Sequence, residues 1–434
     1  MKITKFKIHS ATFALSLLLS NISLAASSIW PSEFMVQEKK AVFVDIKTIN
    51  SKWVYEADNN FLKTESCLDV ALEVEGHPVL LLKSSDQVTI DGKSIKIFHP
   101  VKTNDNFDTP VNLFILDQLT STGTHKICVN SEISPKLDRT TFMNINYNSG
   151  LFTEGFLPAN MRFDSFNGSV EIDVVSAKPY SVFTNGTVKR KTQNSFFVEL
   201  LKNSTSSALF IDLVPTQKVI EKTFPVVLKN GRTLQVQLYS EKGDIGESFL
   251  LSFEQKIKRA FPIIESRLGD FPYTNYVFKA ISRNVEGAFA GAAALQERYN
   301  TIDLVVHEIG HSYFLANVKP LRGVDVWLHE GLGRWASKYE TGTEEFVPNA
   351  PKINLTTSWL LQQQIYDAHA TGFVILKALD FKLKDVGGIS PFLQKIFLKY
   401  QNKALSTEEF FVELENLTGQ SFTKFKQHYF EGLK

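Results

Sequence analysis

Residues 301–311 read Thr-Ile-Asp-Leu-Val-Val-His-Glu-Ile-Gly-His, and residues 325–335 read Asp-Val-Trp-Leu-His-Glu-Gly-Leu-Gly-Arg-Trp. The spacing of the apolar residues predicts that each stretch is a helix. His307 and His311 are four residues apart, so both imidazoles project from one helix face and can reach one cation. Glu308 is rotated from His307 by about 100°, and it can lean over a metal-bound water without ligating the metal. Gly310 is unfavourable inside a helix, which predicts a close neighbour at that turn.

Glu330 offers a third donor after eighteen intervening residues. Imidazole nitrogen suits Zn²⁺ better than Mg²⁺ or Ca²⁺. Two neutral imidazoles and one carboxylate leave a zinc ion with an open position for water, which is typical of catalytic rather than structural sites. We therefore predict one Zn²⁺ per chain, held by His307, His311 and Glu330. The bound water would be activated by the zinc, with Glu308 as the general base.

These motifs resemble those of the gluzincin zinc metallopeptidases of the aminopeptidase N and leukotriene-A hydrolase family. Two further stretches resemble family segments: residues 271–278, similar to P-Y-P-x-x-K-Y, and residues 181–186, similar to the end of the family's N-terminal β domain. The resemblance covers roughly residues 160–434. It implies a β saddle followed by a thermolysin-like catalytic domain that hydrolyses peptide bonds, and the short C-terminal helical tail implies that the family's large C-terminal helical domain is missing.

The first departure from the family concerns the substrate's amino terminus. The family holds it with the Glu of a G-x-M-E-N segment, whereas the matching stretch here runs from Gly287 to Gly291 and has Ala290 at the position of that Glu. A methyl group cannot pair with an ammonium, although Glu286 or Glu297 could take its place. The resemblance favours an aminopeptidase, and Ala290 keeps an endopeptidase or an atypical peptidase open.

The second departure concerns the group that stabilises the oxyanion. The family uses the Tyr of Y-x-K-G, which falls on His369 without a gap and on Tyr366 after one helical turn of slippage. Tyr366 is the favoured donor, and His369 is kept as a donor in its own right. His329 stands where the family usually has Asn, and the sequence leaves open whether it bonds to the site or lies in its wall.

The pattern of apolar residues divides the chain near residue 225. Short alternating or β-branched runs between residues 41 and 215 predict an antiparallel β-sandwich or saddle. After Glu247 the period becomes helical, and Pro262 is expected to kink or divide the first helix. The fold class is thus α+β, with a signal peptide (1–25), an N-terminal β domain (26–225), a mainly helical thermolysin-like catalytic domain (226–385) and a short C-terminal helical tail (386–434).

The N-terminus has the layout of a secretory signal peptide, with a basic start, an apolar stretch from Ala11 to Leu19 and small residues before a cleavage point after Ala25. We expect a periplasmic or secreted protein without a stable membrane span in the mature chain. An oxidising compartment would allow Cys67 and Cys128 to form a disulfide, with two buried thiols as the alternative.

Composition limits the partners. The chain has 47 Lys and Arg against 46 Asp and Glu, so no charge excess indicates nucleic acid, and the expected partner is a peptide or protein substrate. A hypothesis of another class remains, in which the chain is a non-catalytic peptide-binding or assembly factor that retains zinc.

Overall fold

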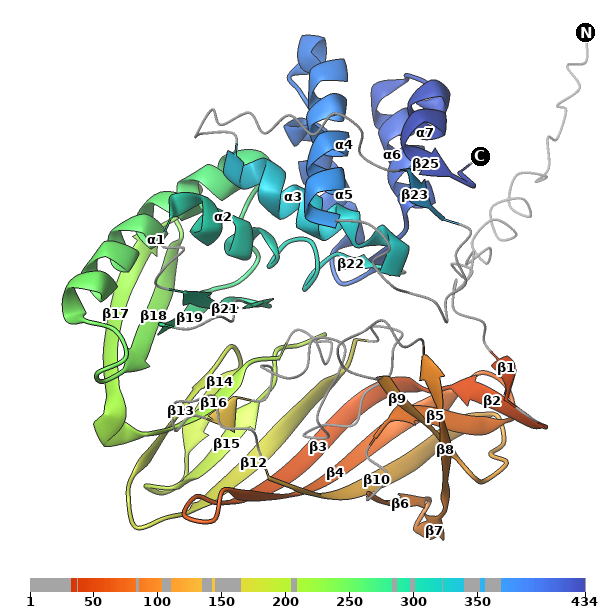
Figure 1. Ribbon diagram of the computed structural model, residues 1–434, viewed down its shortest axis with the longest axis vertical. Coiled ribbons are helices and arrows are strands. Elements are labelled where there is room, and N and C mark those ends of the chain that lie inside the picture. Colours follow the sequence, from red (N-terminus) through yellow and green to blue (C-terminus); the bar gives the residue numbers. More distant parts are fainter. Residues whose placement is uncertain are drawn as a thin grey trace, which may run out of the picture.

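The computed structural model describes residues 33–36, 38–82, 86–103, 111–134, 143–144, 165–203, 209–282, 287–296, 301–321, 323–338, 352–355 and 368–433. The segment expected to be a signal peptide lies outside these residues, as do Glu286, Glu297 and Tyr366. No helix among the described residues is long and apolar enough to cross a membrane. A β domain forms the lower half of the molecule in Figure 1, and a sheet covered by helices forms the upper half.

The β domain is built from two main sheets and a small one. The strands are β1 (Glu33–Val36), β2 (Lys39–Phe43), β3 (Asp45–Glu56), β4 (Phe61–Leu72), β5 (His77–Leu81), β6 (Gln87–Ile90), β7 (Lys93–Ile95), β8 (Ile97–Thr103), β9 (Val111–Leu116), β10 (Gly123–Ile133), β11 (Met143–Asn144), β12 (Asn167–Val175), β13 (Tyr180–Thr184), β14 (Thr187–Arg190), β15 (Ser195–Glu199) and β16 (Ile211–Pro215). Their orders are β14-β15-β12-β3-β4-β10-β6-β7, β1-β2-β5-β9-β8 and β11-β16-β13.

Alternation along the long strands explains how the β domain forms its core. In β4, every second residue from Leu62 to Leu72 is buried, so one face of the eight-stranded sheet packs inward. Most neighbours in these sheets are antiparallel, but β12 pairs with β3 in parallel, as β2 does with β5. Cys67 and Cys128 are directly opposite each other on β4 and β10 and form a disulfide.

The upper half combines a five-stranded sheet with a layer of helices. Its sheet has the order β17 (Val219–Val227), β18 (Thr233–Glu241), β19 (Asn275–Ile281), β21 (Ala292–Gln296) and β20 (Gly287–Phe289), so β20 is an edge strand. The helices are α1 (Glu247–Leu268), α2 (Ile302–Gly310), α3 (Trp327–Lys338), α4 (Ala368–Lys382), α5 (Ser390–Tyr400), α6 (Thr407–Thr418) and α7 (Thr423–Tyr429). Figure 1 shows α1 alongside the sheet, with α2 next to α1 and α3 next to α2.

Two short strand pairs tie the C-terminal region back to the site region. Strand β22 (Lys319–Pro320), after α2, pairs with β24 (Ala404–Leu405), just before α6, and β23 (Ile353–Asn354) pairs with β25 (Phe430–Glu431). Asp325, before α3, accepts hydrogen bonds from the backbone and the hydroxyl of Thr407 at 2.8 and 2.6 Å. The C-terminal helices therefore share one apolar core with the helices of the site.

The predicted fold class is confirmed: a β domain precedes a largely helical second part. The structure adds detail at two of the predicted positions. The predicted boundary at residue 225 falls inside β17, whose ladder partner β18 belongs to the upper sheet. Of the two outcomes expected at Pro262, a kinked or a divided helix, the division does not occur: α1 runs through the proline, because buried side chains on both sides of it, among them Phe261 and Ile264, hold the helix against the core.

Candidate metal centre and pocket

Helix α2 positions three of the candidate residues. Thr301 is its N-cap, and the Thr301 hydroxyl accepts a hydrogen bond from the backbone N–H of Leu304 at 3.2 Å. Val305, Val306 and Ile309 are buried and fix the rotation of the helix. His307 and His311 therefore face the same side, and their Nε2 atoms lie 3.0 Å apart.

Helix α3 brings Glu330 to the two imidazoles. Its Oε2 atom lies 3.5 Å from Nε2 of His307 and 3.7 Å from Nε2 of His311. The close approach depends on glycine: a Cβ on Gly310 would lie 3.3 Å from Cα of Gly333, and a Cβ on Gly333 would lie 2.7 Å from Nδ1 of His307. The close neighbour predicted for Gly310 is confirmed as the backbone of α3.

The donor set fits a tetrahedral metal ion. Bonds of 2.0 to 2.2 Å to nitrogen and oxygen in a tetrahedron separate neighbouring donor atoms by about 3.3 Å. The three separations of 3.0, 3.5 and 3.7 Å fall around that value. Two imidazoles with one carboxylate are also a donor set that Zn²⁺ accepts in catalytic sites. Among the described residues, His307, His311 and Glu330 are the group whose ligand atoms all lie within 4.8 Å of one another.

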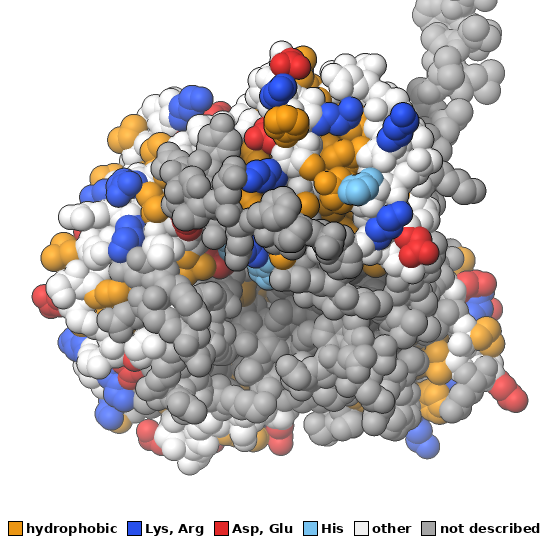
Figure 2. All heavy atoms as spheres, turned by 45° about the horizontal axis from the view of Figure 1, so that its top comes forward, with side chains coloured by type: hydrophobic (Ala, Val, Ile, Leu, Met, Phe, Trp, Pro, Cys, Tyr) orange, Lys and Arg blue, Asp and Glu red, His pale blue; other side chains and the backbone are white. Residues whose placement is uncertain are grey.

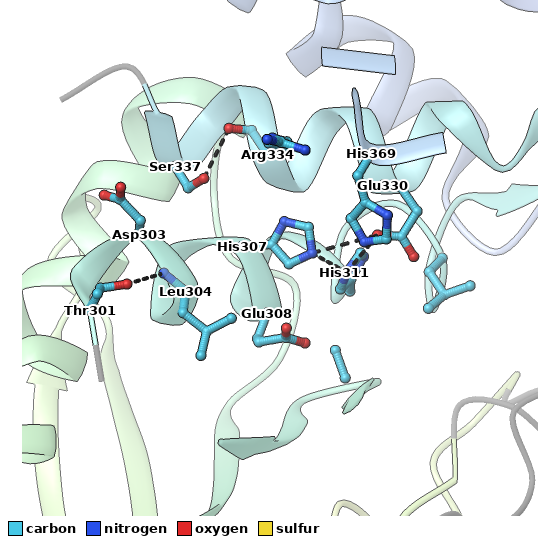
Figure 3. A pocket seen from close by; sticks show the side chains of 12 residues that line it. Thr301, Asp303, Leu304, His307, Glu308, His311, Glu330, Arg334, Ser337 and His369 are labelled. Carbon is cyan, nitrogen blue, oxygen red and sulfur yellow. Dashed lines mark hydrogen bonds and ion pairs between the residues drawn. The ribbon is translucent and has the colours of Figure 1, made fainter. Parts of the chain in front are cut away.

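Two further histidines contact the Glu330 carboxylate. Nε2 of His329 is hydrogen-bonded to Oε1 at 2.9 Å, so His329, which the sequence left undecided, bonds to the site. Nε2 of His369, on α4, lies 2.7 Å from Oε2. The His369 side chain is half exposed, at 48%. Its ring stacks on that of His307 with centroids 5.7 Å apart, and both histidines lie beside the Glu330 carboxylate (Figure 3).

Burial and neighbouring charges set the protonation of the three candidate ligands. Burial lowers the pKa of His311 well below its usual value, which keeps a lone pair available. Burial opposes ionisation of Glu330, but the neighbouring His329 and His311 outweigh it and hold the pKa of Glu330 well below its usual value. For His307, burial also lowers the pKa, but the contact with Glu330 and the charge of Glu308 outweigh it and raise the pKa.

The three candidate ligands open onto a pocket of about 660 Å³. The wall is formed by residues of α2 and α3, by Ala288 on β20 and by His369 on α4; the lining residues are Ala288, Thr301, Asp303, Leu304, His307, Glu308, His311, Leu315, Glu330, Arg334, Ser337 and His369. Glu308 projects from α2 beside the histidines (Figure 3). The Glu308 carboxylate thus lines the same pocket as the three candidate ligands.

The structure separates the remaining candidates. Gly287 begins β20, and Ala290 follows that strand in the turn to β21. The Ala290 side chain is buried in a small apolar cluster with Ala316, Leu201 and Tyr273. The residue of this stretch that lines the pocket is Ala288 instead. Tyr366 lies outside the described residues. Sequence reasoning missed Arg334, one turn after Glu330, and the contact of Gly333 with His307.

No single-sign field marks the face shown in Figure 2, where basic and acidic side chains are interspersed over the coloured surface. This agrees with the near-balanced charge of the chain.

Comparison with known proteins gives matches among solved structures only. No family model and no curated protein sequence matches the chain. The M1 zinc metallopeptidase from Deinococcus radiodurans superposes with a TM-score of 0.67 at 17% identity, over 90% of this chain and 94% of that one. A two-domain M1 zinc metallopeptidase mutant bound to L-arginine gives 0.68 at 17% identity, over 94% and 98%.

Longer proteins match over part of their length. Legionella pneumophila aminopeptidase A gives a TM-score of 0.69 at 13% identity, and the match covers 89% of this chain but 49% of that one. Yeast LTA4 hydrolase gives 0.63 at 13% identity, over 86% and 65%. At these identities the likeness establishes the fold: the chain has the fold of the two-domain M1 zinc metallopeptidases.

Proposed function

We propose that this protein is a zinc-dependent peptidase that hydrolyses peptide bonds with Glu308 as general base. The observation that carries the proposal is the convergence of His307, His311 and Glu330 within 4.8 Å at the wall of a pocket that also contains Glu308. The shared fold with proteins described as M1 zinc metallopeptidases supports the same conclusion.

Each residue of the site has a part in this proposal. His307, His311 and Glu330 would hold the zinc ion, and His329 would keep the Glu330 carboxylate in its orientation. Zinc bound there would supply a Lewis acid that lowers the pKa of a water molecule. Glu308 accepts the proton of the attacking water and passes it to the leaving amine.

The test separates metal binding from catalysis. In the Glu308→Gln protein, the zinc content should stay at about one ion per chain while peptide cleavage falls by roughly 10²- to 10⁴-fold, the range for loss of a general base. Glu431→Gln is a matched control, because Glu431 is exposed and lies in β25, outside the pocket lining. Equal cleavage by the Glu308→Gln and parent proteins would refute the mechanism.

The oxyanion donor is assigned by a second pair of variants. His369 lines the pocket, whereas Tyr366 is favoured by the family resemblance. Replacing the donor by Phe should lower kcat by roughly 10²- to 10³-fold and leave KM little changed. Comparing His369→Phe with Tyr366→Phe identifies the donor, and a loss of zinc in either variant would instead indicate a metal ligand.

The subclass is proposed as aminopeptidase-like, with an endopeptidase as the alternative. Ala290 offers no carboxylate to an ammonium, and its side chain is buried. Cleavage of free and N-acetylated forms of the same peptides decides between the two: preference for the free amine supports an aminopeptidase, and indifference supports an endopeptidase. Zinc-loaded protein that binds peptides but cleaves none would favour the non-catalytic binding factor.

We also propose that the protein is exported after removal of residues 1–25. The basic and then apolar N-terminal segment supports this. Sequencing the N-terminus of the mature protein should find Ala26 first, in a periplasmic or secreted fraction. An intact N-terminus in the cytoplasm would contradict it.

A further inference from the structure

The turn that joins β20 to β21 is bonded to the β domain. Strand β20 is the edge of the upper sheet, and its Ala288 lines the pocket beside Glu308. Asn185, which directly follows β13 of the β domain, donates from Nδ2 to the backbone carbonyl of Ala290 at 2.7 Å. A residue of one half of the molecule therefore contacts the turn that follows a pocket-lining strand of the other half.

Both polar atoms of the Asn185 side chain have a defined role. Oδ1 accepts a hydrogen bond from the backbone N–H of Phe210 at 3.0 Å, inside the β domain. Nδ2 makes the bond to Ala290 across the interface. Asn185 is 7% exposed, so water does not readily replace either bond, and loss of one leaves a buried polar group unsatisfied.

Other contacts also hold the two halves together. Phe183 stacks on Tyr239 with ring centroids 3.7 Å apart, and Phe210 packs against Phe289 at 5.4 Å. The charged side chains of this interface, Asp212 and Lys279, are fully buried and pair at 3.0 Å. Removing the Asn185 amide should therefore leave the two halves docked, while the β20–β21 turn loses its hydrogen bond to the β domain.

Within the upper half, the turn is bonded to the residue that follows His311. The hydroxyl of Ser312 accepts from the N–H of Gly291 and donates to the carbonyl of Phe289, both at 3.3 Å. These two bonds are long, whereas the Gly291 carbonyl accepts from the N–H of Val277 at 3.0 Å and the bond from Asn185 measures 2.7 Å. Hydrogen bonds thus hold the turn to Ser312 in the upper half and to Asn185 in the β domain.

We propose that Asn185 is a positioning residue: through the Ala290 carbonyl it fixes edge strand β20 at the distance from Glu308 that peptide binding requires. The inference rests on the proposed peptidase function, because it takes a peptide as the occupant of the pocket. It predicts that the β domain contributes to substrate affinity without touching the substrate or the metal ligands.

Asn185→Asp isolates the bond that crosses the interface. The variant keeps an acceptor for Phe210 but places a carboxylate oxygen against the Ala290 carbonyl. At pH 8 we expect the affinity for a peptide to fall by roughly tenfold or more, because two acceptors then face each other in a buried site. At pH 5 to 6 the introduced carboxyl group becomes protonated and can donate again, so affinity relative to the parent should recover.

Affinity is measured with zinc-loaded full-length protein in the Glu308→Gln background, using the peptide that the parent cleaves fastest. Asn194→Asp is the matched control, because both polar atoms of the Asn194 side chain bond only within the β domain, to Tyr180, Ser176 and Lys178. It should leave affinity unchanged even if it lowers the melting temperature. If Asn185→Asp does not fold, Asn185→Ser replaces it; affinity should fall by a similar factor without recovery at low pH.

A second measurement needs neither metal nor peptide. Amide hydrogen exchange of residues 287–296 should be faster in Asn185→Asp than in the parent at pH 8, and unchanged in Asn194→Asp. Exchange at the parent rate, or equal effects of the two variants on affinity, would overturn the positioning role. A parent protein that cleaves no peptide would overturn the proposed function instead, and the exchange result would still test the role of Asn185.

Discussion

Gly333 allows His307 to lie against helix α3. A Cβ at residue 333 would lie 2.7 Å from Nδ1 of His307 and 3.0 Å from its Cε1, so Gly333→Ala must displace the imidazole. We expect zinc affinity to fall by roughly 10- to 100-fold, the usual effect of disturbing a group that orients a ligand. Competition with a chelator measures it. Gly246→Ala is the control, since a Cβ there meets nothing closer than 3.8 Å; equal zinc affinity in both variants would contradict the prediction.

At this scale the sequence predicted the candidate donors but not what orients them. Two histidines four residues apart on one helix must share a face, and this placed His307 and His311 together before any coordinates. The bond between His329 and Glu330 could not be predicted, because it depends on side-chain rotamers of neighbouring residues. Asn185 could not be predicted either, because it is separated by 105 residues from the carbonyl that it contacts.

The backbones of helices α3 and α4 approach closely where Gly331 faces Gly372. A Cβ on Gly372 would lie 2.7 Å from both Cα of Gly331 and the carbonyl oxygen of Trp327. Gly372→Ala should therefore force the helices apart and lower the free energy of unfolding by about 1 to 3 kcal/mol. It should also move His369, which lies three residues before Gly372 in the first turn of α4 and contacts Glu330. Denaturant unfolding tests this, with exposed Leu398→Ala as the control; an unchanged midpoint for Gly372→Ala would refute it.

One element that sequence patterns missed is a strand of the upper sheet. Strand β21 reads Ala-Ala-Ala-Leu-Gln and is buried at every position, so it shows neither alternation nor β-branched residues. The helices were predicted from the helical period of their apolar residues, and in the structure α6 begins with a capping box between Ser406 and Glu409. Amphipathic elements are visible in a sequence, whereas a strand covered on both faces needs its neighbours to be identified.

For the whole molecule, the disulfide stabilises the β domain apart from the site. Cys67 and Cys128 close a loop with a sequence separation of 61, which corresponds to a stabilisation of about 2 to 5 kcal/mol. The double variant Cys67→Ser/Cys128→Ser should lose that much in denaturant unfolding, while zinc content and peptide cleavage of the folded protein stay at parent levels. Loss of zinc binding under native conditions would show instead that the β domain controls the metal centre.

The two halves are held together by a buried charged group as well as by apolar packing. Asp212, on β16, forms an ion pair with Lys279 at 3.0 Å and accepts a hydrogen bond from the Tyr239 hydroxyl at 2.6 Å. Lys279 and Tyr239 belong to the upper sheet. Asp212→Ala leaves the Lys279 ammonium in a fully buried site, so we expect the free energy of unfolding to fall by about 3 to 5 kcal/mol.

Asp212→Leu combined with Lys279→Met separates the charge from the packing. Apolar side chains of similar volume remove both buried charges, so most of the lost stability should return, since a well-packed apolar pair is often as stable as a buried ion pair. Denaturant unfolding of the single and double variants gives the coupling between the two sites. If the double variant is no more stable than Asp212→Ala, the interface depends on the hydrogen bond from Tyr239 rather than on charge balance, and the ion pair is not what holds the halves together.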